Sequence, residues 1–544
     1  MKHNYIIVGA GPAGLQMAFF LQKAGLDYVI LESASKAGFF YKTFPKQRTL
    51  ISINKKYNYF PEKTFNLRHD WNSLLSDNEQ LSFTSYSEDL FPSADDLYQY
   101  LNDFAEFNEL NIKYNTEITL IDKENNGTFI LKCKDGTQFQ TETLLMATGA
   151  RRQNMPSEIE GIEHTISYED VSAHKEPYIN KRIAILGGGN SAFETANHLA
   201  DVAANVHVFI RSPLKMAYET HFVGNLRAKY TNMFDMYQLK SLHAILKPRI
   251  KKITKLENGN LQTQHEYDFA DSKVPGTLKL TREYEYIINC TGFQYTNSSL
   301  FADHIKPKEF MEGKFFDLTE TWESTNVKNL YFIGTLMQAI DRKASSGFIH
   351  GFRYNIRTLS NLLMEKNENK AYPSKTIALN PFNEFLKQLY ERFSIGDAIF
   401  QLYGFLGDLL VLNDTKSQLE WFEDLPIGVI KNKIQTGKHS LQLTLEFGFH
   451  HYPGKSSMEF MGPSDPHATD KSAFLHPVIR HFYQGQVDEF HFGDSLLGRW
   501  DMPHAEGGAI GSYHVEFYNW MANIFDIDQI NPKDLGENPN FVRS

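Results

Sequence analysis

The chain uses one pattern of apolar and polar positions twice. An apolar run at residues 4–9 leads into glycines, then into a helical spacing of apolar residues over 12–25 and a second apolar run at 27–32. The same succession returns over 182–212. A short apolar run indicates a buried parallel strand. Each copy therefore predicts a strand, a helix and a second strand joined by a right-handed crossover.

Different patterns fill the chain between and after the two copies. Helical spacing over 94–111 predicts a further helix. Alternation over 112–148, with a turn at Asp135-Gly136, predicts antiparallel strands. Another strand is predicted to end the segment 279–292. A loop-rich region is expected between the first copy and about residue 90.

The last part of the chain, from about residue 375, has a different character. A helix is predicted over 380–393, and partial alternation over 418–452 and 486–518 indicates a β-rich unit. Nine histidines lie between residues 439 and 514, but they lack paired cysteines and the His-Glu-x-x-His pattern of a zinc site. We therefore expect no metal there. We expect a module that covers the rest of the protein or binds a partner or a second copy of the chain.

Composition and charge narrow the classes of function. The 544 residues carry a net charge of −10 without a block of Lys or Arg, which argues against nucleic acid or an anionic membrane as the partner. No apolar run approaches the ~20 residues that span a bilayer, and we expect no leader ahead of the first strand. The two cysteines, Cys133 and Cys290, fit a reducing compartment. We expect a cytoplasmic protein.

The first glycine loop has the form of a dinucleotide site. Its Gly-x-Gly-x-x-Gly follows a strand and opens a helix, so the glycines permit a tight turn, a close approach to a pyrophosphate and close helix packing. The N-terminus of the helix adds its positive dipole. An acid at the end of the next strand is expected to bind ribose hydroxyls. The predicted cofactor contacts are Gly9, Gly11, Pro12, Ala13, Gly14 and Glu32.

The second glycine loop carries alanine in third place and a basic residue where the first copy has an acid. Arg211 ends the strand that follows, and an arginine at this position accommodates the 2′-phosphate of NADP, which a carboxylate would repel. We expect NADPH rather than NADH. The predicted contacts are Gly187, Gly189, Asn190, Ser191, Ala192, Arg211 and Ser212.

Two further strand ends indicate that the first loop holds FAD, which is long enough to pass several strands. Apolar strands run into Thr148-Gly149 and Gly334-Thr335, where glycine lets the backbone approach a long ligand. The segment 335–357 is expected to begin a helix whose positive end points at the flavin ring. The predicted flavin contacts are Thr148, Gly149, Gly334, Thr335, Ser346, Gly347 and His350.

These motifs predict an α/β fold with two Rossmann-like dinucleotide-binding domains, one for FAD and one for NADP, and a C-terminal α+β or β-rich module. The NADP domain is inserted into the FAD domain. The predicted boundaries are 1–155 for the first part of the FAD domain, 156–289 for the NADP domain, 290–375 for the second part of the FAD domain and 376–544 for the C-terminal module.

With two such loops, the sequence resembles flavin-containing monooxygenases. LESASKAGFF at 31–40 is similar to their acid followed by Gly-Gly-x-Trp, with Phe40 in place of the tryptophan. RTLISINKKY at 48–57 lies where that group has a Ser/Asn stretch that contacts the flavin. The resemblance implies cofactor contacts for Gly38, Phe40 and Asn54, and it makes Asn54 the candidate catalytic residue beside the flavin itself.

A closer resemblance, over about residues 4–360, is to the FAD-dependent oxidoreductase domain-containing family. It is carried by FNLRHDWNSLLSD, FPSADDLYQYLNDFA, GGGNSAFETA, THFVGNLRA and SSGFIHGFRYN. The resemblance implies bound FAD and an NAD(P)H site. One member of this family is a flavoprotein of the endoplasmic reticulum associated with degradation. The sequence shows neither a secretion signal nor a retention tail, so we do not expect that role to transfer.

Two departures from the monooxygenase group bear on the chemistry. Its fingerprint F-x-G-x-x-x-H-x-x-x-[FY] is incomplete: Gly161, His164 and Tyr168 echo it, but the phenylalanine is missing and the histidine comes one residue early. No Cys-x-x-Cys lies near either loop, so an internal dithiol is not expected to reduce a disulfide.

The leading hypothesis is an FAD-dependent NADPH oxidoreductase of monooxygenase type. NADPH reduces FAD, which reacts with O2 to oxygenate a small organic substrate. The incomplete fingerprint keeps open an NADPH oxidase or reductase that oxygenates no substrate. A third hypothesis is a flavin-containing protein that binds a partner through its C-terminal module.

Overall fold

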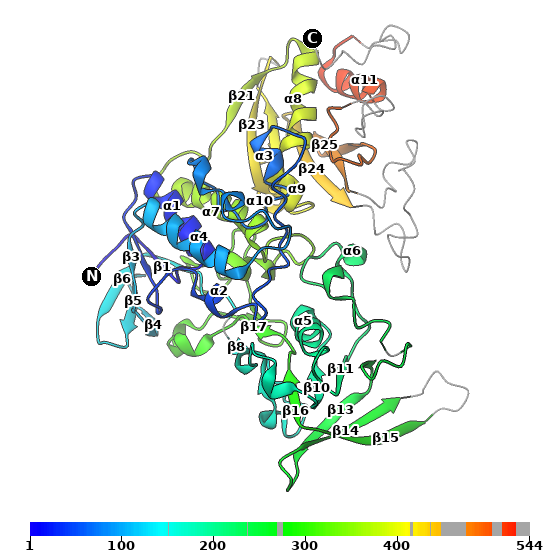
Figure 1. Cartoon of the computed structure of the whole chain (residues 1–544). Coiled ribbons are helices and arrows are strands. Elements are labelled where there is room, and N and C mark those ends of the chain that lie inside the picture. Colours follow the sequence, from blue (N-terminus) through cyan, green and yellow to red (C-terminus); the bar gives the residue numbers. More distant parts are fainter. Residues whose placement is uncertain are drawn as a thin grey trace.

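The computed structural model describes residues 1–150, 152–236, 238–268, 276–413, 417–435, 437–447, 475–502 and 514–528. Figure 1 shows three units. We call residues 1–150 and 295–374 the first unit, residues 152–294 the second unit and the residues from 375 onward the C-terminal unit. In the view of Figure 1 the second unit lies at the bottom and the C-terminal unit at the top.

The first unit is built on a parallel sheet with the strand order β3-β2-β1-β7-β20. Strands β1, β2, β7 and β20 are buried along their whole length, as expected where both faces of a parallel sheet are covered. The bounds are β1 Tyr5–Val8, β2 Tyr28–Leu31, β3 Ile112–Lys113, β7 Thr143–Met146 and β20 Leu330–Phe332.

Helices cover one face of this sheet, and a small antiparallel sheet covers the other. Ile7 of β1 packs in a cluster with the helices α1, α4 and α7, whereas its neighbour Ile6 packs with β4, β5 and β6 on the opposite face. The helices are α1 Pro12–Lys23, α2 Phe39–Thr43, α3 Lys63–Asn66, α4 Ala94–Phe107 and α7 Ile349–Asn367, and the remaining strands are β4 Ile118–Lys123, β5 Phe129–Cys133, β6 Gln138–Thr141, β18 Glu309–Phe310 and β19 Phe315–Phe316.

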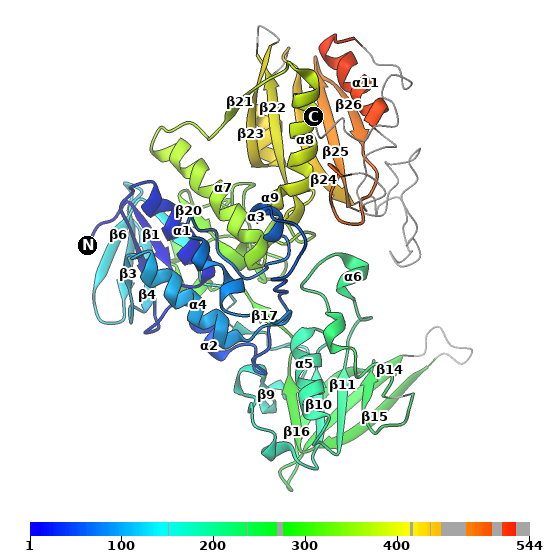
Figure 2. The same ribbon diagram turned by 45° about the horizontal axis from the view of Figure 1, so that its top comes forward.

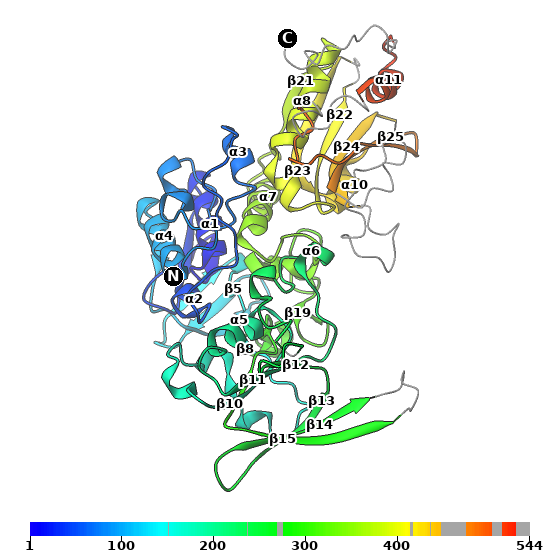
Figure 3. The same cartoon turned by 45° about the vertical axis from the view of Figure 1, so that its right-hand side comes forward.

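The second unit repeats the arrangement on a smaller scale. Its parallel sheet has the order β12-β11-β10-β16-β9, and an antiparallel ribbon of β13, β14 and β15 extends away from the rest (Figures 1 and 3). The bounds are β9 Ile166–Ser167, β10 Arg182–Leu186, α5 Asn190–Leu199, β11 Asn205–Phe209, α6 Ala217–Thr220, β12 Ala244–Leu246, β13 Arg249–Lys255, β14 Leu261–Asp268, β15 Thr277–Tyr284 and β16 Tyr286–Asn289.

The chain enters and leaves the second unit through a short two-stranded ribbon. β8, Arg152–Gln153, pairs with β17, Phe293–Gln294, in antiparallel register. The predicted domain boundaries after residues 155 and 289 lie close to this ribbon, and we keep them as a proposal.

The C-terminal unit is an antiparallel sheet with the order β21-β23-β22-β24-β25-β26. Helix α8 lies along this sheet (Figure 2), and its apolar residues share a core with β22, β23 and β24. The bounds are β21 Lys375–Ala378, α8 Phe382–Ile395, α9 Asp397–Gln401, β22 Leu406–Leu412, β23 Gln418–Pro426, α10 Ile427–Lys433, β24 Ser440–Phe447, β25 Leu475–Tyr483, β26 Gln486–His491 and α11 His514–Phe525.

The expectation of strands is wrong for one part of the β-rich region. Strand structure was expected over 486–518, but β26 ends at His491 and the segment from His514 is helix α11. The buried residues Phe517, Tyr518, Met521 and Ala522 have helical spacing, so a helix lets them enter the core that α8 also lines.

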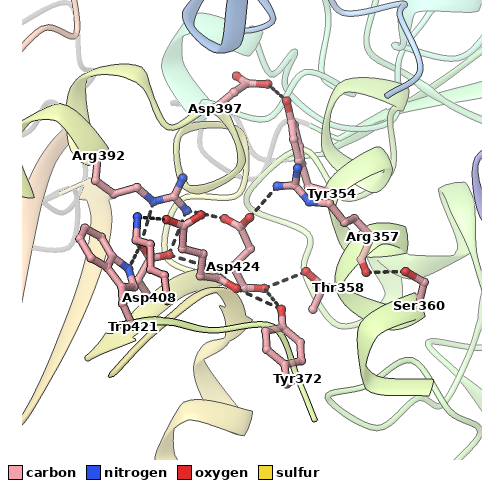
Figure 4. A network of polar contacts seen from close by, with 12 residues as sticks. Tyr354, Arg357, Thr358, Ser360, Tyr372, Arg392, Asp397, Asp408, Trp421 and Asp424 are labelled. Atoms are coloured by element: carbon pink, nitrogen blue, oxygen red, sulfur yellow. Dashed lines mark hydrogen bonds and ion pairs between the residues drawn. The ribbon is translucent and has the colours of Figure 1, made fainter. Parts of the chain in front are cut away.

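A buried network of charges ties α7 of the first unit to the C-terminal unit (Figure 4). Arg392 of α8 bonds Asp408 through Nε at 2.7 Å and Asp424 through Nη2 at 2.6 Å. Arg357 of α7 bonds the other oxygen of Asp424 at 2.6 Å. Burial alone would raise the pKa of Asp424, but the two guanidinium groups hold it below its ordinary value. Asp424 is therefore ionised and shared between the units.

A second buried contact between these units involves α7 one turn earlier. Arg353 is fully buried and bonds Asp397 at the start of α9, at 2.9 Å. Arg68, also buried, donates to the carbonyl oxygens of Phe393 and Gly396 at the end of α8. These contacts fix the C-terminal unit against the first unit by charge and hydrogen bonds.

We predict that Asp424→Asn destabilises the protein by about 3–5 kcal/mol, because it removes the buried carboxylate that the largely buried Arg392 and the partly exposed Arg357 share. Trp421, whose indole donates to Asp408, reports on this region, so urea unfolding followed by tryptophan fluorescence is the measurement. The neighbouring Glu423→Gln is the control. Its pair with Lys375 is half exposed, so its loss should cost less than about 1 kcal/mol. Equal losses in the two variants would contradict the role given to Asp424.

Candidate functional site

The first glycine loop joins β1 to α1 at the carboxyl edge of the sheet. Gly9 has φ +106°, and a Cβ there would lie 2.7 Å from the carbonyl oxygen of Ala147. A Cβ on Gly14 would lie 2.0 Å from the carbonyl oxygen of Gly9. The close packing therefore requires both glycines. A Cβ on Gly11 would meet no atom within 4 Å, so open space lies in front of the helix.

The N-terminus of α1 has no side chain that caps it. Gly11 is the residue before the helix, Pro12 is its first residue, and no acid lies in the first turn. In contrast, α4 begins with the hydroxyl of Ser93 accepting from the amide of Asp95, as in an ordinary capped helix. The positive end of α1 is therefore left for an anion from outside the chain.

Glu32 lies at the edge of the same loop. Its Oε2 accepts from the amide of Ala10 and its Oε1 from the amide of Ala34, each at 2.7 Å. The side chain is 9% exposed. Each carboxylate oxygen keeps acceptor capacity after these bonds, so the position fits an acid that also accepts from ribose hydroxyls.

The two predicted strand ends meet the loop. Thr148 and Gly149 follow β7 directly after Ala147, whose carbonyl oxygen Gly9 approaches. Gly334 has φ +76°, and a Cβ there would lie 2.5 Å from the Cβ of Ala13 in α1. Thr335 follows it at the end of β20. The sequence-predicted residues at these two strand ends thus converge on the start of α1.

The helix expected over 335–357 begins later than predicted. A short 3-10 helix covers Gly334–Ala339, and α7 starts only at Ile349. The carboxylate of Asp341 accepts two backbone N–H groups and the hydroxyl of Ser346, which folds the intervening chain into a turn. Ser346 and Gly347 lie in this turn and not in the helix.

His350, in the first turn of α7, is buried without hydrogen-bond partners. It is 1% exposed, and neither ring nitrogen has a partner in the described chain. Its ring stacks on Trp71 with centroids 4.3 Å apart, and the ring of Phe348 lies nearly parallel to it with its centroid 5.9 Å away. Burial, together with the nearby Arg353 and Arg227, holds the pKa of His350 well below its ordinary value, so the ring is neutral. A neutral imidazole still needs one donor and one acceptor.

Gly38, Phe40 and Asn54 were expected from the monooxygenase resemblance. Gly38 has φ +65° and donates its N–H to the carbonyl of Ala10, beside the first loop. Phe40 is 43% exposed and lies against other aromatic rings at the junction of the units. Asn54 is buried and donates to the carbonyl of Ser87, while its Oδ1 has no partner. Catalytic involvement of Asn54 stays a prediction.

The second glycine loop has the same construction. Gly187 has φ +134°, and a Cβ there would lie 2.3 Å from the carbonyl oxygen of Cys290 at the end of β16. A Cβ on Gly189 would meet nothing within 4 Å, and α5 has neither a capping side chain nor an acid in its first turn. Ser191 and Ala192 form that first turn, with Ala192 fully buried.

Asn190, the first residue of α5, links this loop to the segment 224–227. Its Nδ2 donates to the carbonyl of Asn225 at 3.1 Å, and its Oδ1 accepts from the amide of Arg227 at 2.9 Å. The predicted Asn190 is therefore a structural part of the loop and positions Arg227.

Arg211 extends into solvent at the end of β11. Its side chain is 81% exposed and pairs with Glu158 at 3.1 Å. Ser212, next to it, is also exposed. An exposed surface ion pair contributes little, so Arg211 can exchange Glu158 for a phosphate at small cost.

Trp71 and Arg227 were missed by sequence reasoning. The guanidinium carbon of Arg227 lies 5.1 Å from the ring centre of Trp71, so the second unit contacts the first beside His350. The only signal was that both residues fall in segments quoted for the family resemblance. A single aromatic or basic residue in a loop carries no spacing pattern.

The residues that echo the monooxygenase fingerprint have packing roles. A Cβ on Gly161 would lie 2.0 Å from the carbonyl oxygen of Ile253, so Gly161 permits a close contact with β13. Tyr168 is buried and donates to Glu194 of α5. His164 is largely exposed and faces Glu163.

The histidine-rich tail contains paired rings. His439 lies 2.9 Å from His481, and His476 lies 3.0 Å from His491, nitrogen to nitrogen. In the portion of the chain that the structure describes, no group of three or more metal-ligating side chains is found. The other tail histidines on which the expectation rested, His450, His451, His467 and His504, lie outside the described residues.

A cavity of about 980 Å³ lies between the first and C-terminal units, lined by the far end of α1, by residues of the segment 55–85 and by α8. None of the sequence-predicted site residues lines it. The glycine loops are the better candidate sites, because open space at Gly11 and Gly189 coincides with uncapped helix N-termini.

The geometry fits a dinucleotide at each loop. Each loop has an uncapped helix N-terminus, an open position at its second or third glycine and a strand end held close by glycine. A family model described as pyridine nucleotide-disulphide oxidoreductase matches residues 6–334, a range that includes both loops. The chain belongs to this family.

Curated relatives extend the likeness over most of the chain. FAD-dependent oxidoreductase domain-containing protein 2 of Mus musculus is 33% identical over 510 residues, which cover 88% of this chain and 76% of the mouse protein. The protein of the same name from Danio rerio is 30% identical and covers 92% of this chain and 81% of its own. The resemblance predicted from the sequence is confirmed, and the chain is a member of a family of FAD-dependent oxidoreductases.

Solved structures share the fold at low identity. A bacillithiol disulfide reductase from Staphylococcus aureus is 18% identical with a TM-score of 0.51, over 68% of this chain and 99% of its own. A flavin-containing monooxygenase from Stenotrophomonas maltophilia is 16% identical with a TM-score of 0.51, over 67% of this chain and 99% of its own. The predicted α/β fold with two Rossmann-type domains is confirmed.

Within the described ranges, no helix has the length and apolar character needed to cross a membrane. The cytoplasmic location expected from the sequence stays a prediction.

We predict that Gly11→Ala folds but loses the FAD that the sequence assigns to the first loop. Gly11 has an ordinary φ of −76°, and the added methyl meets no protein atom, so it enters only the space in front of α1. The measurement is flavin absorbance per chain, with circular dichroism to check folding. Gly276→Ala, where a Cβ is equally unobstructed, is the control. Full flavin in Gly11→Ala would refute the assignment.

We predict that Glu194→Gln gains stability relative to the native chain as the pH rises from 5 to 8. Burial raises the pKa of Glu194 to about 7, although the amide of Gln47 and the hydroxyl of Tyr168 donate to it. A carboxyl whose folded pKa is raised loses stability as the pH rises from its unfolded to its folded pKa, here on the order of 3 kcal/mol. The midpoint of thermal unfolding measures this. A constant difference between the two proteins across that pH range would contradict it.

Proposed function

We propose that the chain is an FAD-dependent oxidoreductase that uses NADPH, with FAD at the first glycine loop and NADPH at the second. The observation that carries the proposal is the junction between the units. There the buried His350 has two ring nitrogens without partners, and Arg227 of the second unit lies beside it over Trp71. Membership of a family of FAD-dependent oxidoreductases supports the same reading.

The residues present suit both cofactors. FAD would be held by the amides at the start of α1, by Glu32 and by the strand ends at 147–149 and 334–335; NADPH would be held by α5 and Arg211. When bound, FAD supplies the capacity to accept hydride from NADPH and to pass two electrons to an acceptor. The chain contributes position, charge and exclusion of water.

Of the residues at the junction, His350 is the one that we propose to contact the bound cofactor or substrate. Because its ring is neutral, it offers one N–H donor and one lone pair to a bound cofactor or substrate. Its stack on Trp71 holds the ring plane, and its burial keeps water away. We assign it a positioning role.

For the acceptor, the proposal is O2 with oxygenation of a small organic substrate, as in flavin-containing monooxygenases. An NADPH oxidase or reductase is the second candidate. It is favoured by the incomplete fingerprint, because Gly161 and Tyr168 both have packing roles in this fold. Asn54 stays the candidate catalytic side chain of the first alternative, since its buried Oδ1 has no partner.

Binding of a partner or a second copy through the C-terminal unit is the third candidate. Leu496 is 87% exposed and Tyr59 is 90% exposed, and the ion pair of Arg499 with Glu62 joins the two segments that carry them. These two exposed side chains favour a partner-binding surface, which is compatible with the redox proposal. A cytoplasmic location belongs to the same proposal.

The test is reduction of the purified protein by NADPH without oxygen, followed by admission of oxygen. We expect the flavin absorbance to bleach with NADPH and to return with oxygen. Peroxide equal to the NADPH consumed would select the oxidase. Peroxide well below NADPH consumption in the presence of a substrate would select the monooxygenase. A flavin that NADPH does not bleach would overturn the proposal and favour the partner-binding protein.

Gly189→Ala is the matched control for the second loop. Its Cβ meets no protein atom, so the variant should fold and stay yellow. It should be reduced much more slowly by NADPH and at the native rate by dithionite, a reductant that needs no binding site.

A further inference from the structure

Arg227 bonds the second glycine loop through its main chain and reaches the first unit, at Trp71, through its side chain. Its amide donates to Oδ1 of Asn190, at the start of α5, at 2.9 Å. Its Nη1 donates to the carbonyl oxygen of Ile51 in the first unit at 2.9 Å, and its guanidinium lies over Trp71. Main chain and side chain are thus each fixed, one to each unit.

The charge of Arg227 is not neutralised by the protein. Among the described residues, no carboxylate lies within ion-pair distance of its guanidinium, and its hydrogen bond is to a neutral carbonyl. The side chain is partly buried, and burial lowers its pKa. Leaving a partly desolvated cation unpaired is costly, so such a site favours an anion from outside the chain.

A second positive group lies on the same side. The N-terminus of α5 is uncapped, has no acid in its first turn and has open space at Gly189. Asn190 bonds the main-chain amide of Arg227, so the residue that carries the guanidinium is anchored at the start of α5. Together they offer backbone donors and a planar cation to a phosphate.

Arg211 and Arg227 divide the second site into two ends. Arg211 is exposed at the end of β11 and bonds Glu158 of the second unit. Arg227 lies at the junction, in contact with the first unit through Ile51 and Trp71. A dinucleotide at the α5 loop that reaches the first unit must pass Arg227 with its nicotinamide half.

We propose that Arg227 binds the phosphate on the nicotinamide side of NADP(H), and so positions the nicotinamide at the Trp71–His350 stack, while Arg211 binds the 2′-phosphate of the adenosine half. This inference rests on the proposed function of the second loop. It makes Arg227 a binding residue for both NADPH and NADH, and Arg211 the residue that distinguishes them.

The test is binding by isothermal titration calorimetry, with oxidised ligands so that no electron transfer occurs. The FAD-loaded protein is titrated with NADP⁺, with NAD⁺ and with 2′,5′-ADP, which lacks the nicotinamide half. For Arg227→Gln we expect about tenfold weaker binding of NADP⁺ and NAD⁺ and native binding of 2′,5′-ADP. For Arg211→Gln we expect weaker NADP⁺ and 2′,5′-ADP, and native NAD⁺.

Two further variants test whether the effect of Arg227→Gln is specific to Arg227 or follows from the loss of any nearby positive charge or from misfolding. Lys229→Gln removes a cation from the same segment that rests on Phe91, and it should bind all three ligands as the native protein does. Arg227→Lys keeps the charge and should recover part of the affinity. Flavin content and circular dichroism of each variant establish that the protein is folded.

The outcomes distinguish this inference from the function on which it rests. If the native protein binds none of the three ligands, the proposed function fails, and this inference with it. If the native protein binds NADP⁺ and Arg227→Gln binds it equally well, only the inference fails. It also fails if Arg227→Gln weakens 2′,5′-ADP as much as NADP⁺, or if Lys229→Gln weakens binding as much as Arg227→Gln.

Discussion

Both glycine loops depend on the same constraint: the turn that follows the first strand must lie so close to the end of a neighbouring strand that no side chain fits between them. In the first loop a Cβ on Gly9 would lie 2.7 Å from the carbonyl oxygen of Ala147, and in the second a Cβ on Gly187 would lie 2.3 Å from the carbonyl oxygen of Cys290. This contact holds each helix with its uncapped N-terminus at the carboxyl edge of its sheet. Each helix N-terminus therefore offers backbone donors to a pyrophosphate.

Helix α7 connects the site to the rest of the molecule. Its first turn carries His350, one turn further Arg353 bonds Asp397, and another turn further Arg357 bonds Asp424. The C-terminal unit is therefore ion-paired to the helix that begins at the junction of the two nucleotide units. The C-terminal unit thereby fixes the position of α7 and contributes to the site through this helix.

The sequence predicted well what has a period or a fixed motif. The strand, glycine loop and helix of each nucleotide unit were predicted because their chemistry is local: buried apolar strands, glycines at set intervals and a helix after them. A helix was predicted over 94–111, and α4 covers Ala94–Phe107 of that range. Glu32 and Arg211 each end a short apolar run and carry the charge that the expected ligand requires. Their residue types therefore located both strand ends in the sequence.

What escaped prediction depends on contacts between distant segments. Trp71, His350 and Arg227 come together from three parts of the chain, and no spacing relates them. The late start of α7 depends on one carboxylate, Asp341, that folds the preceding turn. Asn190, which stays a predicted cofactor contact, also holds the main chain of Arg227 through its Oδ1. Such roles become visible only when side chains are placed.

The central claim is that the first glycine loop holds FAD as a resident cofactor. The most direct measurement is to denature the purified native protein with heat and to identify and count the released flavin by chromatography against FAD and FMN. We expect one FAD for each chain. A protein that carries no flavin and takes up none when incubated with FAD would contradict it.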